Sequence, residues 1–186
     1  MKTLLILALV IVTSAMATVA DKSLPEFYTT DMDNNPVALS DYLGKGPVVV
    51  SFWASDCDPC KEEQVYLNKI YKKYKDDGLE VLAVSTDSTK TLSDVKKHIK
   101  SNNYKFTVLL DVDGNVATSC AVPATPYTFL LDETGKVIHE KMGFRKGDEK
   151  VLEEEIVEYF EEMKEVESKI IELEESDNSS TTEASE

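Results

Sequence analysis

Residues 51–63 read Ser51-Phe52-Trp53-Ala54-Ser55-Asp56-Cys57-Asp58-Pro59-Cys60-Lys61-Glu62-Glu63, with two cysteines three positions apart. The pair follows an unbroken apolar run at residues 48–53 and opens a charged segment with helical periodicity. A buried strand that leads into a helix with both thiols in its first turn is typical of a dithiol redox site.

The same cysteine spacing also occurs in half of a zinc site. Structural zinc needs four ligands, usually supplied as nearby pairs. The remaining candidates are Cys120, His98 and His139, and none of them forms a pair at a ligand spacing. An inert cysteine pair is the other alternative. We therefore predict a redox-active disulfide between Cys57 and Cys60, with no metal and no further cofactor.

Residues 1–20 have the features of a secretory signal peptide. Lys2 precedes an apolar run at residues 4–12, and small residues at 15–17 or 18–20 offer a cleavage site. An uncleaved anchor is the alternative, although residues 4–20 are shorter than the ~20 apolar residues that a spanning helix prefers. The sequence predicts an exported protein, in a periplasm, secreted or anchored facing outward, where disulfides are stable.

The acidic charge of the chain is concentrated at its C-terminal end. The formal net charge is -15, and residues 151–186 hold 14 acids against two lysines. Binding to nucleic acid phosphates needs clustered Lys and Arg, which this chain lacks, so nucleic acid is excluded as a partner.

Extended and helical segments alternate between residues 21 and 160, which we expect to form one domain. Strands are expected at residues 48–53, 79–84, 106–110, 127–131 and 136–142, after an N-terminal hairpin at 27–39. Helices are expected at 59–75, 91–102 and 115–120. The apolar face expected to be buried on the first helix comprises Val65, Tyr66, Ile70, Tyr71 and Tyr74. This order predicts an α/β fold with a central mixed sheet flanked by helices.

The last helix is expected to start near Asp148 and to be unusually long. Its apolar residues recur at alternating steps of four and three, a heptad pattern, at Leu152, Ile156, Tyr159, Met163, Val166, Ile170 and Leu173. The first turns are expected to pack on the sheet, and residues 161–175 form an acidic extension. Three arrangements of the extension are open: it projects into solvent, lies along its own domain, or pairs with a second copy of the chain. Because like charges would meet in such a pair, we expect a monomer. Residues 176–186 predict a disordered acidic tail.

Cys57 lies at the start of the expected helix, where unpaired backbone amides and the positive end of the helix dipole favour a thiolate. Cys60 follows one turn later, within reach of a mixed disulfide on Cys57. Cys57 is therefore the expected attacking thiol and Cys60 the resolving one. Pro59 helps to fix the helix start, where its missing N–H is not needed.

Residues 52–60 resemble the active-site segment of the thioredoxin superfamily, particularly its exported TlpA/ResA-like branch of thiol-disulfide oxidoreductases. Residues 27–43 resemble that branch's N-terminal hairpin and lead-in, and residues 122–132 its cis-proline segment. The resemblance implies a thioredoxin-like fold, with a cis peptide at Thr125-Pro126 opposite the cysteines that forms one wall of a substrate groove. It also implies that the partners are disulfide-containing exported proteins and an upstream thiol electron donor.

Members of this branch often carry a functional glutamate three residues after the second cysteine, which is the position of Glu63. The resemblance implies that Glu63 moves a proton on or off the thiols, since Ser51 replaces the buried aspartate of thioredoxin. A solvated surface glutamate is the alternative. Trp53 is expected to pack beside the site rather than to react.

Two residues depart from the family pattern. Asp56 stands where an aromatic residue usually precedes the first cysteine, and with Asp58 it flanks Cys57 by two carboxylates. Like charge disfavours the thiolate, so we expect a higher pKa for Cys57 than in a thioredoxin. Such a dithiol gives up electrons readily, which predicts a reductase of protein disulfides. Cys120 stands where a tyrosine is common and is expected to be a small buried hydrophobe.

Two other functions remain open from the sequence. A peroxiredoxin-like peroxidase has a related fold, but Ala54 occupies the position of its peroxide-activating hydroxyl. A thioredoxin-like scaffold that recruits a partner through its acidic helix is the second alternative.

Overall fold

The computed structural model describes residues 22–182 of the chain, with side chains to residue 174. The predicted signal peptide lies outside the described residues and stays a prediction. Within residues 22–182, no helix combines the length and the apolar character needed to cross a membrane.

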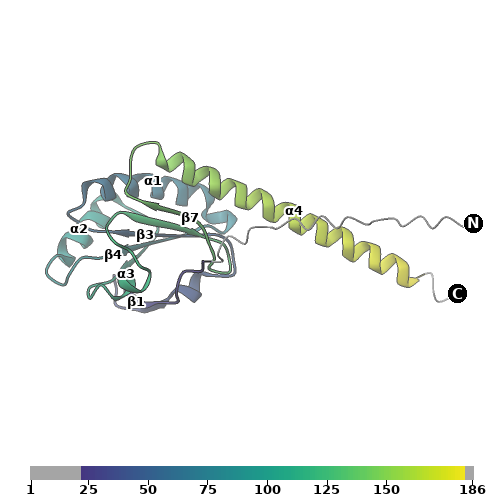
Figure 1. Ribbon diagram of the computed structural model, residues 1–186, viewed down its shortest axis with the longest axis horizontal. Coiled ribbons are helices and arrows are strands. Elements are labelled where there is room, and N and C mark those ends of the chain that lie inside the picture. The colour runs from purple at the N-terminus through teal and green to yellow at the C-terminus, as the bar shows by residue number, and fades with distance from the viewer. Residues whose placement is uncertain (1–21, 183–186) are drawn as a thin grey trace, which may run out of the picture.

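A mixed sheet of seven strands forms the centre of the fold, in the order β2-β1-β5-β4-β3-β6-β7 (Figure 1). The strands are β1 (Tyr28–Asp31), β2 (Pro36–Ala38), β3 (Val48–Trp53), β4 (Glu80–Ser85), β5 (Thr107–Leu110), β6 (Tyr127–Leu131) and β7 (Val137–Met142). Strand β3 pairs parallel with β4 and antiparallel with β6. The N-terminal hairpin β1-β2 and the hairpin β6-β7 are both present, as the sequence predicted.

Helices cover both faces of this sheet. One face packs against α1 (Asp58–Tyr74), α2 (Leu92–Asn102) and the first turns of α4 (Asp148–Thr182). The other face packs against the short α3 (Asn115–Ser119), the 3-10 helix η1 (Leu39–Tyr42) and the N-terminal segment. A second 3-10 turn, η2 (Lys75–Asp77), follows α1. The predicted α/β fold with a central mixed sheet is confirmed.

Strand β3 leads directly to the cysteines and is buried along its whole length. Its alternate residues enter opposite cores: Val49 and Trp53 on the side of α1, and Val50 and Phe52 on the side of α3. Because both faces of the strand are packed, the start of α1 is fixed to a rigid part of the sheet.

The buried face of α1 differs from the predicted one. Val65 is 41% exposed, whereas the buried residues are Cys60, Glu63, Gln64, Leu67, Asn68 and Ile70. Three of these are polar: Glu63 is hydrogen-bonded to Ser51 of β3, the oxygen of Gln64 to His98 of α2, and Asn68 to the backbone of Lys105 in the loop before β5, while Gln64 Nε2 has no partner. Ile70 is buried and Tyr71 and Tyr74 pack against the core, as predicted, so the predicted face is wrong at Val65 and lacks the polar residues, which apolarity alone does not indicate.

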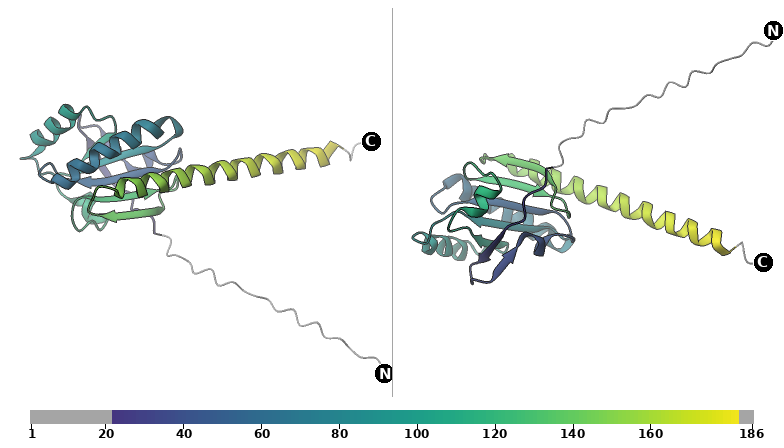
Figure 2. Two further views of the ribbon diagram at one scale, coloured as in Figure 1. Left: turned by 90° about the horizontal axis from the view of Figure 1, so that it is seen from above. Right: turned by 60° about the horizontal axis from the view of Figure 1, so that its bottom comes forward.

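Helix α4 leaves the domain after its first turns and projects into solvent (Figures 1 and 2). Ile156 is fully buried, but Val166, Ile170 and Leu173 are 47%, 50% and 66% exposed. The extension therefore does not lie along its own domain. Its backbone is helical to Thr182, so the predicted disordered tail differs from the structure at residues 176–182, because no Gly or Pro interrupts α4.

Removal of residues 161–186 is expected to leave folding and thiol chemistry nearly unchanged, because the packed part of α4 ends near Phe160. We expect a stability change of at most about 0.5 kcal/mol and unchanged reduction of insulin disulfides. A chain ending at residue 150 is the control, since it also loses the buried Leu152 and Ile156 and should be destabilised by several kcal/mol. Lost insulin reduction in the shorter deletion, measured by turbidity, contradicts this assignment.

Candidate active site

The two cysteines lie at the N-terminus of α1 and are joined by a disulfide. Cys57 is the N-cap residue, and its Sγ accepts a hydrogen bond from the backbone N–H of Cys60 at 3.2 Å. Cys57 is half-buried, whereas Cys60 is fully buried in the core between α1 and the sheet. Of the two sulfurs, that of Cys57 is therefore the one open to a partner.

Charged residues flank the accessible cysteine. Asp56 and Asp58 are both exposed, and Lys61 Nζ forms an ion pair with Asp58 Oδ1 at 3.1 Å. Pro59 lies in the first turn of α1, as expected, and Trp53 is fully buried beneath the site. The two carboxylates predicted beside Cys57 are thus both present, one of them partly balanced by a lysine.

The peptide bond between Thr125 and Pro126 is cis, which confirms the sequence prediction. Tyr127, the next residue, pairs with Phe52 in the antiparallel β3-β6 ladder. Pro126 therefore lies at the end of the sheet where β3 leads to the cysteines. The Pro126 carbonyl accepts a hydrogen bond from Gly143 N at 2.8 Å, which ties this segment to the loop after β7.

Glu63 lies on the buried face of α1, with only 5% of its surface exposed. Ser51 Oγ donates to Glu63 Oε2 at 2.9 Å, and Thr128 Oγ1 donates to Glu63 Oε1 at 2.8 Å. Ser51 and Thr128 are direct partners across the β3-β6 ladder, so their hydroxyls lie side by side. The solvated surface glutamate considered above is therefore wrong.

The proton affinity of this carboxyl is unusual. Burial raises the pKa of Glu63 from 4.5 to about 7, the hydroxyls of Thr128 and Ser51 act in the opposite direction, and the Asp148 charge raises the pKa further. A group that titrates near neutral pH can both accept and release a proton under physiological conditions.

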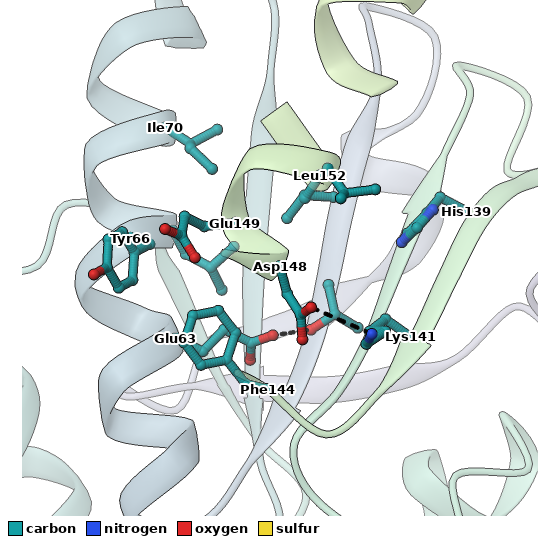
Figure 3. A pocket seen from close by; sticks show the side chains of 12 residues that line it. Glu63, Tyr66, Ile70, His139, Lys141, Phe144, Asp148, Glu149 and Leu152 are labelled. Atoms are coloured by element: carbon teal, nitrogen blue, oxygen red, sulfur yellow. Dashed lines mark hydrogen bonds and ion pairs between the residues drawn. The ribbon is translucent and has the colours of Figure 1, made fainter. Parts of the chain in front are cut away.

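A small cavity of about 60 Å³ lies beside Glu63, between α1, the β6-β7 hairpin and the start of α4 (Figure 3). Its lining includes Tyr66, Phe144, Asp148 and Lys141. Such a volume has room for water molecules. Glu63 is thus buried from the bulk solvent but borders a partly open space whose lining is mostly apolar, with Lys141, Asp148 and Glu149 as charged members.

Asp87 is a buried acid near the site that the sequence analysis missed. It is 6% exposed and accepts hydrogen bonds from Ser55 N at 2.8 Å, Ser85 Oγ at 2.9 Å and Ser55 Oγ. These contacts fasten the turn between Trp53 and Cys57 to the end of β4. The available signal was an acid three residues after the strand expected at 79–84.

Replacement of Asp87 by Ala is expected to destabilise the oxidised protein by about 1–3 kcal/mol, because the buried donors of Ser55 and Ser85 lose their acceptor. Urea unfolding measures the loss. Asp87→Asn, which keeps an acceptor, should recover part of it, and Asp113→Ala, at an exposed aspartate, is the control. Equal stability of the Asp87→Ala and Asp113→Ala proteins contradicts the role of this contact.

His98 is a second residue that sequence spacing did not indicate. Its Nε2 lies 3.1 Å from the side-chain oxygen of the buried Gln64, and its ring centroid is 5.5 Å from that of Trp53. Burial, with a contribution from the charge of Lys61, lowers the pKa of His98. A neutral imidazole therefore supports the indole on the face of the sheet that carries α1.

The fold and the site together define a thioredoxin-like dithiol protein: a mixed sheet, a cysteine pair that opens a helix and a cis-proline at the same end of the sheet. A model of the AhpC/TSA family matches residues 20–140. The chain belongs to this family and is one of its thiol-disulfide oxidoreductases.

Individual relatives agree with this assignment. The thiol-disulfide oxidoreductase ResA of Bacillus thuringiensis subsp. konkukian is 38% identical over 122 residues, which are 66% of this chain and 69% of the relative. ResA of Geobacillus kaustophilus is 35% identical over 125 residues, 67% of this chain and 70% of that protein.

Solved structures show the same likeness. The crystal structure of a putative thiol:disulfide interchange protein DsbE from Chlorobium tepidum superposes with a TM-score of 0.69 and 33% identity, covering 75% of this chain and 96% of that one. The resemblance to the TlpA/ResA-like branch is thus confirmed.

Proposed function

We propose that this oxidoreductase reduces disulfides in exported proteins, with Cys57 as the attacking thiol and Cys60 as the resolving thiol. The observation that carries the proposal is the position of the pair: Cys57 is accessible at the helix N-cap, and Cys60 is buried one turn behind it. The Cys57 thiolate attacks a substrate disulfide, forms a mixed disulfide and releases one substrate thiolate. Cys60 then attacks Cys57 Sγ, which releases the second substrate thiolate and forms the Cys57–Cys60 disulfide.

Each turnover transfers two electrons to the substrate, and the two released substrate thiolates take up protons. An upstream dithiol of an electron-donor protein then reduces Cys57–Cys60 by the same exchange chemistry. The disulfide itself is the electron carrier, so the proposal requires no further cofactor.

Glu63 is assigned the proton transfer that accompanies resolution. It follows Cys60 by one turn of α1, is also buried and has a pKa raised to about 7. A neutral-range carboxylate can take the proton of the buried Cys60 thiol as that thiol becomes the nucleophile. The Ser51 and Thr128 hydroxyls hold the carboxyl in place for this task.

The cis-proline segment is assigned the opposite wall of the substrate groove. Thr125 is half-buried and directly precedes Pro126 at the end of the sheet that bears the cysteines. In this arrangement the Thr125 backbone pairs with an extended substrate segment, as an added strand would.

Asp56 and Asp58 set the direction of electron flow toward the substrate. Their charges disfavour the Cys57 thiolate, which is a feature of the reduced state, and so favour the disulfide. Asp56→Asn with Asp58→Asn is therefore expected to raise the midpoint potential of the pair by about 30 mV, a tenfold change in the exchange equilibrium. Equilibration with glutathione buffers measures it.

The control for this change carries two charge removals far from the cysteines, Glu154→Gln and Glu158→Gln on exposed positions of α4. Its potential should equal that of the unaltered protein. An unchanged or lowered potential in the Asp56/Asp58 variant contradicts the electrostatic account of direction.

Export of the protein, into a periplasm in a bacterium with two membranes, is part of the same proposal. It is supported by the apolar run at residues 4–12 and by the need of a disulfide reductase for substrates that carry disulfides. Cell fractionation, with N-terminal sequencing of the mature chain, tests it.

The reaction class separates this proposal from a peroxidase. Reduction of insulin disulfides with slow consumption of hydrogen peroxide is expected, because Ala54 offers no hydroxyl near Cys57. Rapid peroxide consumption without insulin reduction contradicts the proposal.

A further inference from the structure

An ion pair lies at the rim of the cavity beside Glu63. Lys141, near the end of β7, and Asp148, the first residue of α4, are joined by a contact of 3.4 Å between Nζ and Oδ1. Their side chains are 46% and 26% exposed, so both border solvent as well as the cavity. Figure 3 shows the Asp148 carboxylate pointing toward Glu63 and held by Lys141.

The position of Asp148 is fixed by the backbone as well. Its Oδ2 accepts a hydrogen bond from Arg145 N at 2.9 Å, so one carboxylate oxygen serves the loop and the other serves Lys141. A side chain held at both oxygens presents its charge at a constant place relative to Glu63.

Three other titratable residues border the cavity: Glu149, His139 and Tyr66. Glu149 Oε2 accepts a hydrogen bond from Gly147 N at 2.6 Å, and His139 Nδ1 lies 3.8 Å from Glu155 Oε1. Tyr66, from α1, contributes a phenol to the lining. Among the lining residues, Lys141 and Asp148 form an ion pair with each other, and both border solvent.

We propose that Asp148 and Lys141 are positioning residues for the reaction: their ion pair sets the proton affinity of Glu63, and with it the pH range in which mixed disulfides are resolved. The functional part rests on the proposed role of Glu63.

The two charges act on Glu63 with opposite signs. A negative charge at Asp148 disfavours the Glu63 carboxylate, and a positive charge at Lys141 favours it. When Asp148 or Lys141 is replaced by a neutral residue, the charge of the remaining partner is no longer balanced beside the buried Glu63 carboxyl. Asp148→Asn should therefore lower the titration midpoint of Glu63, and Lys141→Met should raise it, each by about 0.5–1 pH unit after screening by solvent.

The midpoint is measured on the oxidised full-length protein, in which the disulfide cysteines do not titrate. Carbon-13 labelling of the glutamate carboxyls gives an NMR titration, and the Glu63 resonance is assigned by its loss in Glu63→Gln. We expect opposite shifts in Asp148→Asn and Lys141→Met and an intermediate midpoint in the double variant. Glu154→Gln removes a charge from an exposed position of α4 and should shift nothing.

Midpoints in Asp148→Asn and Lys141→Met that equal that of Glu154→Gln, or that move in the same direction, overturn the proposal. Because the two variants predict opposite signs, a general loosening of the fold cannot imitate the expected result.

The pH dependence of insulin reduction completes the test. The inflection assigned to Glu63 should move with the NMR midpoint in each variant. If Glu63→Gln leaves the pH profile unchanged, the proposed role of Glu63 fails, and with it the functional part of this inference. If Glu63→Gln removes the inflection but the ion-pair variants do not move it, only the present inference fails.

Discussion

A Cys57→Ser protein is expected to reduce insulin disulfides no faster than the buffer does, a loss of at least about 1,000-fold. Cys57 Sγ is the half-buried sulfur at the helix N-cap, and Cys60 is fully buried behind it. No second thiol among the described residues can replace it, since Cys120 is buried on the opposite face of the sheet. Turbidity of precipitating insulin chains measures the rate.

The matched variants separate attack from resolution. Cys60→Ser should also lose turnover but should accumulate a mixed disulfide through Cys57, visible by mass spectrometry under non-reducing conditions. Cys120→Ser is the control and should retain the rate of the unaltered protein. Full activity of Cys57→Ser, or mixed disulfides that form through Cys60, contradicts the assigned roles.

Glu63→Gln is expected to slow turnover at pH 7 by about 100-fold, the lower end of what a positioned general acid or base contributes. The amide keeps the shape of the side chain; its oxygen still accepts from one hydroxyl and its NH2 group donates to the other, but it carries no transferable proton. The inflection near pH 7 in the rate profile should disappear with it. Glu62→Gln, at the exposed neighbouring glutamate, should leave rate and profile unchanged.

The same variant should gain stability at alkaline pH. The pKa of Glu63 is raised from 4.5 to about 7 in the folded protein, so the unfolded chain releases this proton at lower pH than the folded protein does. The folded protein therefore loses stability as the pH rises from about 4.5 to about 7. Glu63→Gln avoids this loss, so its advantage should be absent near pH 4 and reach about 3 kcal/mol above pH 7. Urea unfolding at both pH values measures it, and an equal advantage at both contradicts the raised pKa.

The parts of the fold that local rules govern could be predicted from sequence. The unbroken run at residues 48–53 is a buried strand, and Cys57 does cap the following helix. The cis peptide before Pro126 came from the family resemblance, because residue spacing alone does not distinguish cis from trans.

The features that depend on tertiary pairing could not be derived from the local sequence pattern, and Glu63 was indicated only by the family resemblance. Glu63 is buried because Ser51 and Thr128 meet across two strands, and a local pattern does not contain that pairing. The same reason applies to Asp87, whose partner Ser55 belongs to another segment. The cavity beside Glu63 needs α1, β7 and α4 in place, so no single stretch of sequence encodes it.

The projecting part of α4 shows a different limit. Its heptad pattern continues from the buried Leu152 to the exposed Leu173 without a break. The pattern therefore predicts an apolar helix face correctly but not where its contact with the domain ends, which the size of the sheet decides.

The central claim is that the Cys57–Cys60 dithiol donates electrons to substrate disulfides. The midpoint potential of this couple is its most direct test. Equilibration of the full chain with defined dithiothreitol buffers, read by thiol alkylation, gives the value. The two carboxylates beside Cys57 predict a potential at or below that of thioredoxin, about -270 mV. A potential near about -120 mV, typical of a periplasmic disulfide-forming enzyme, would contradict it.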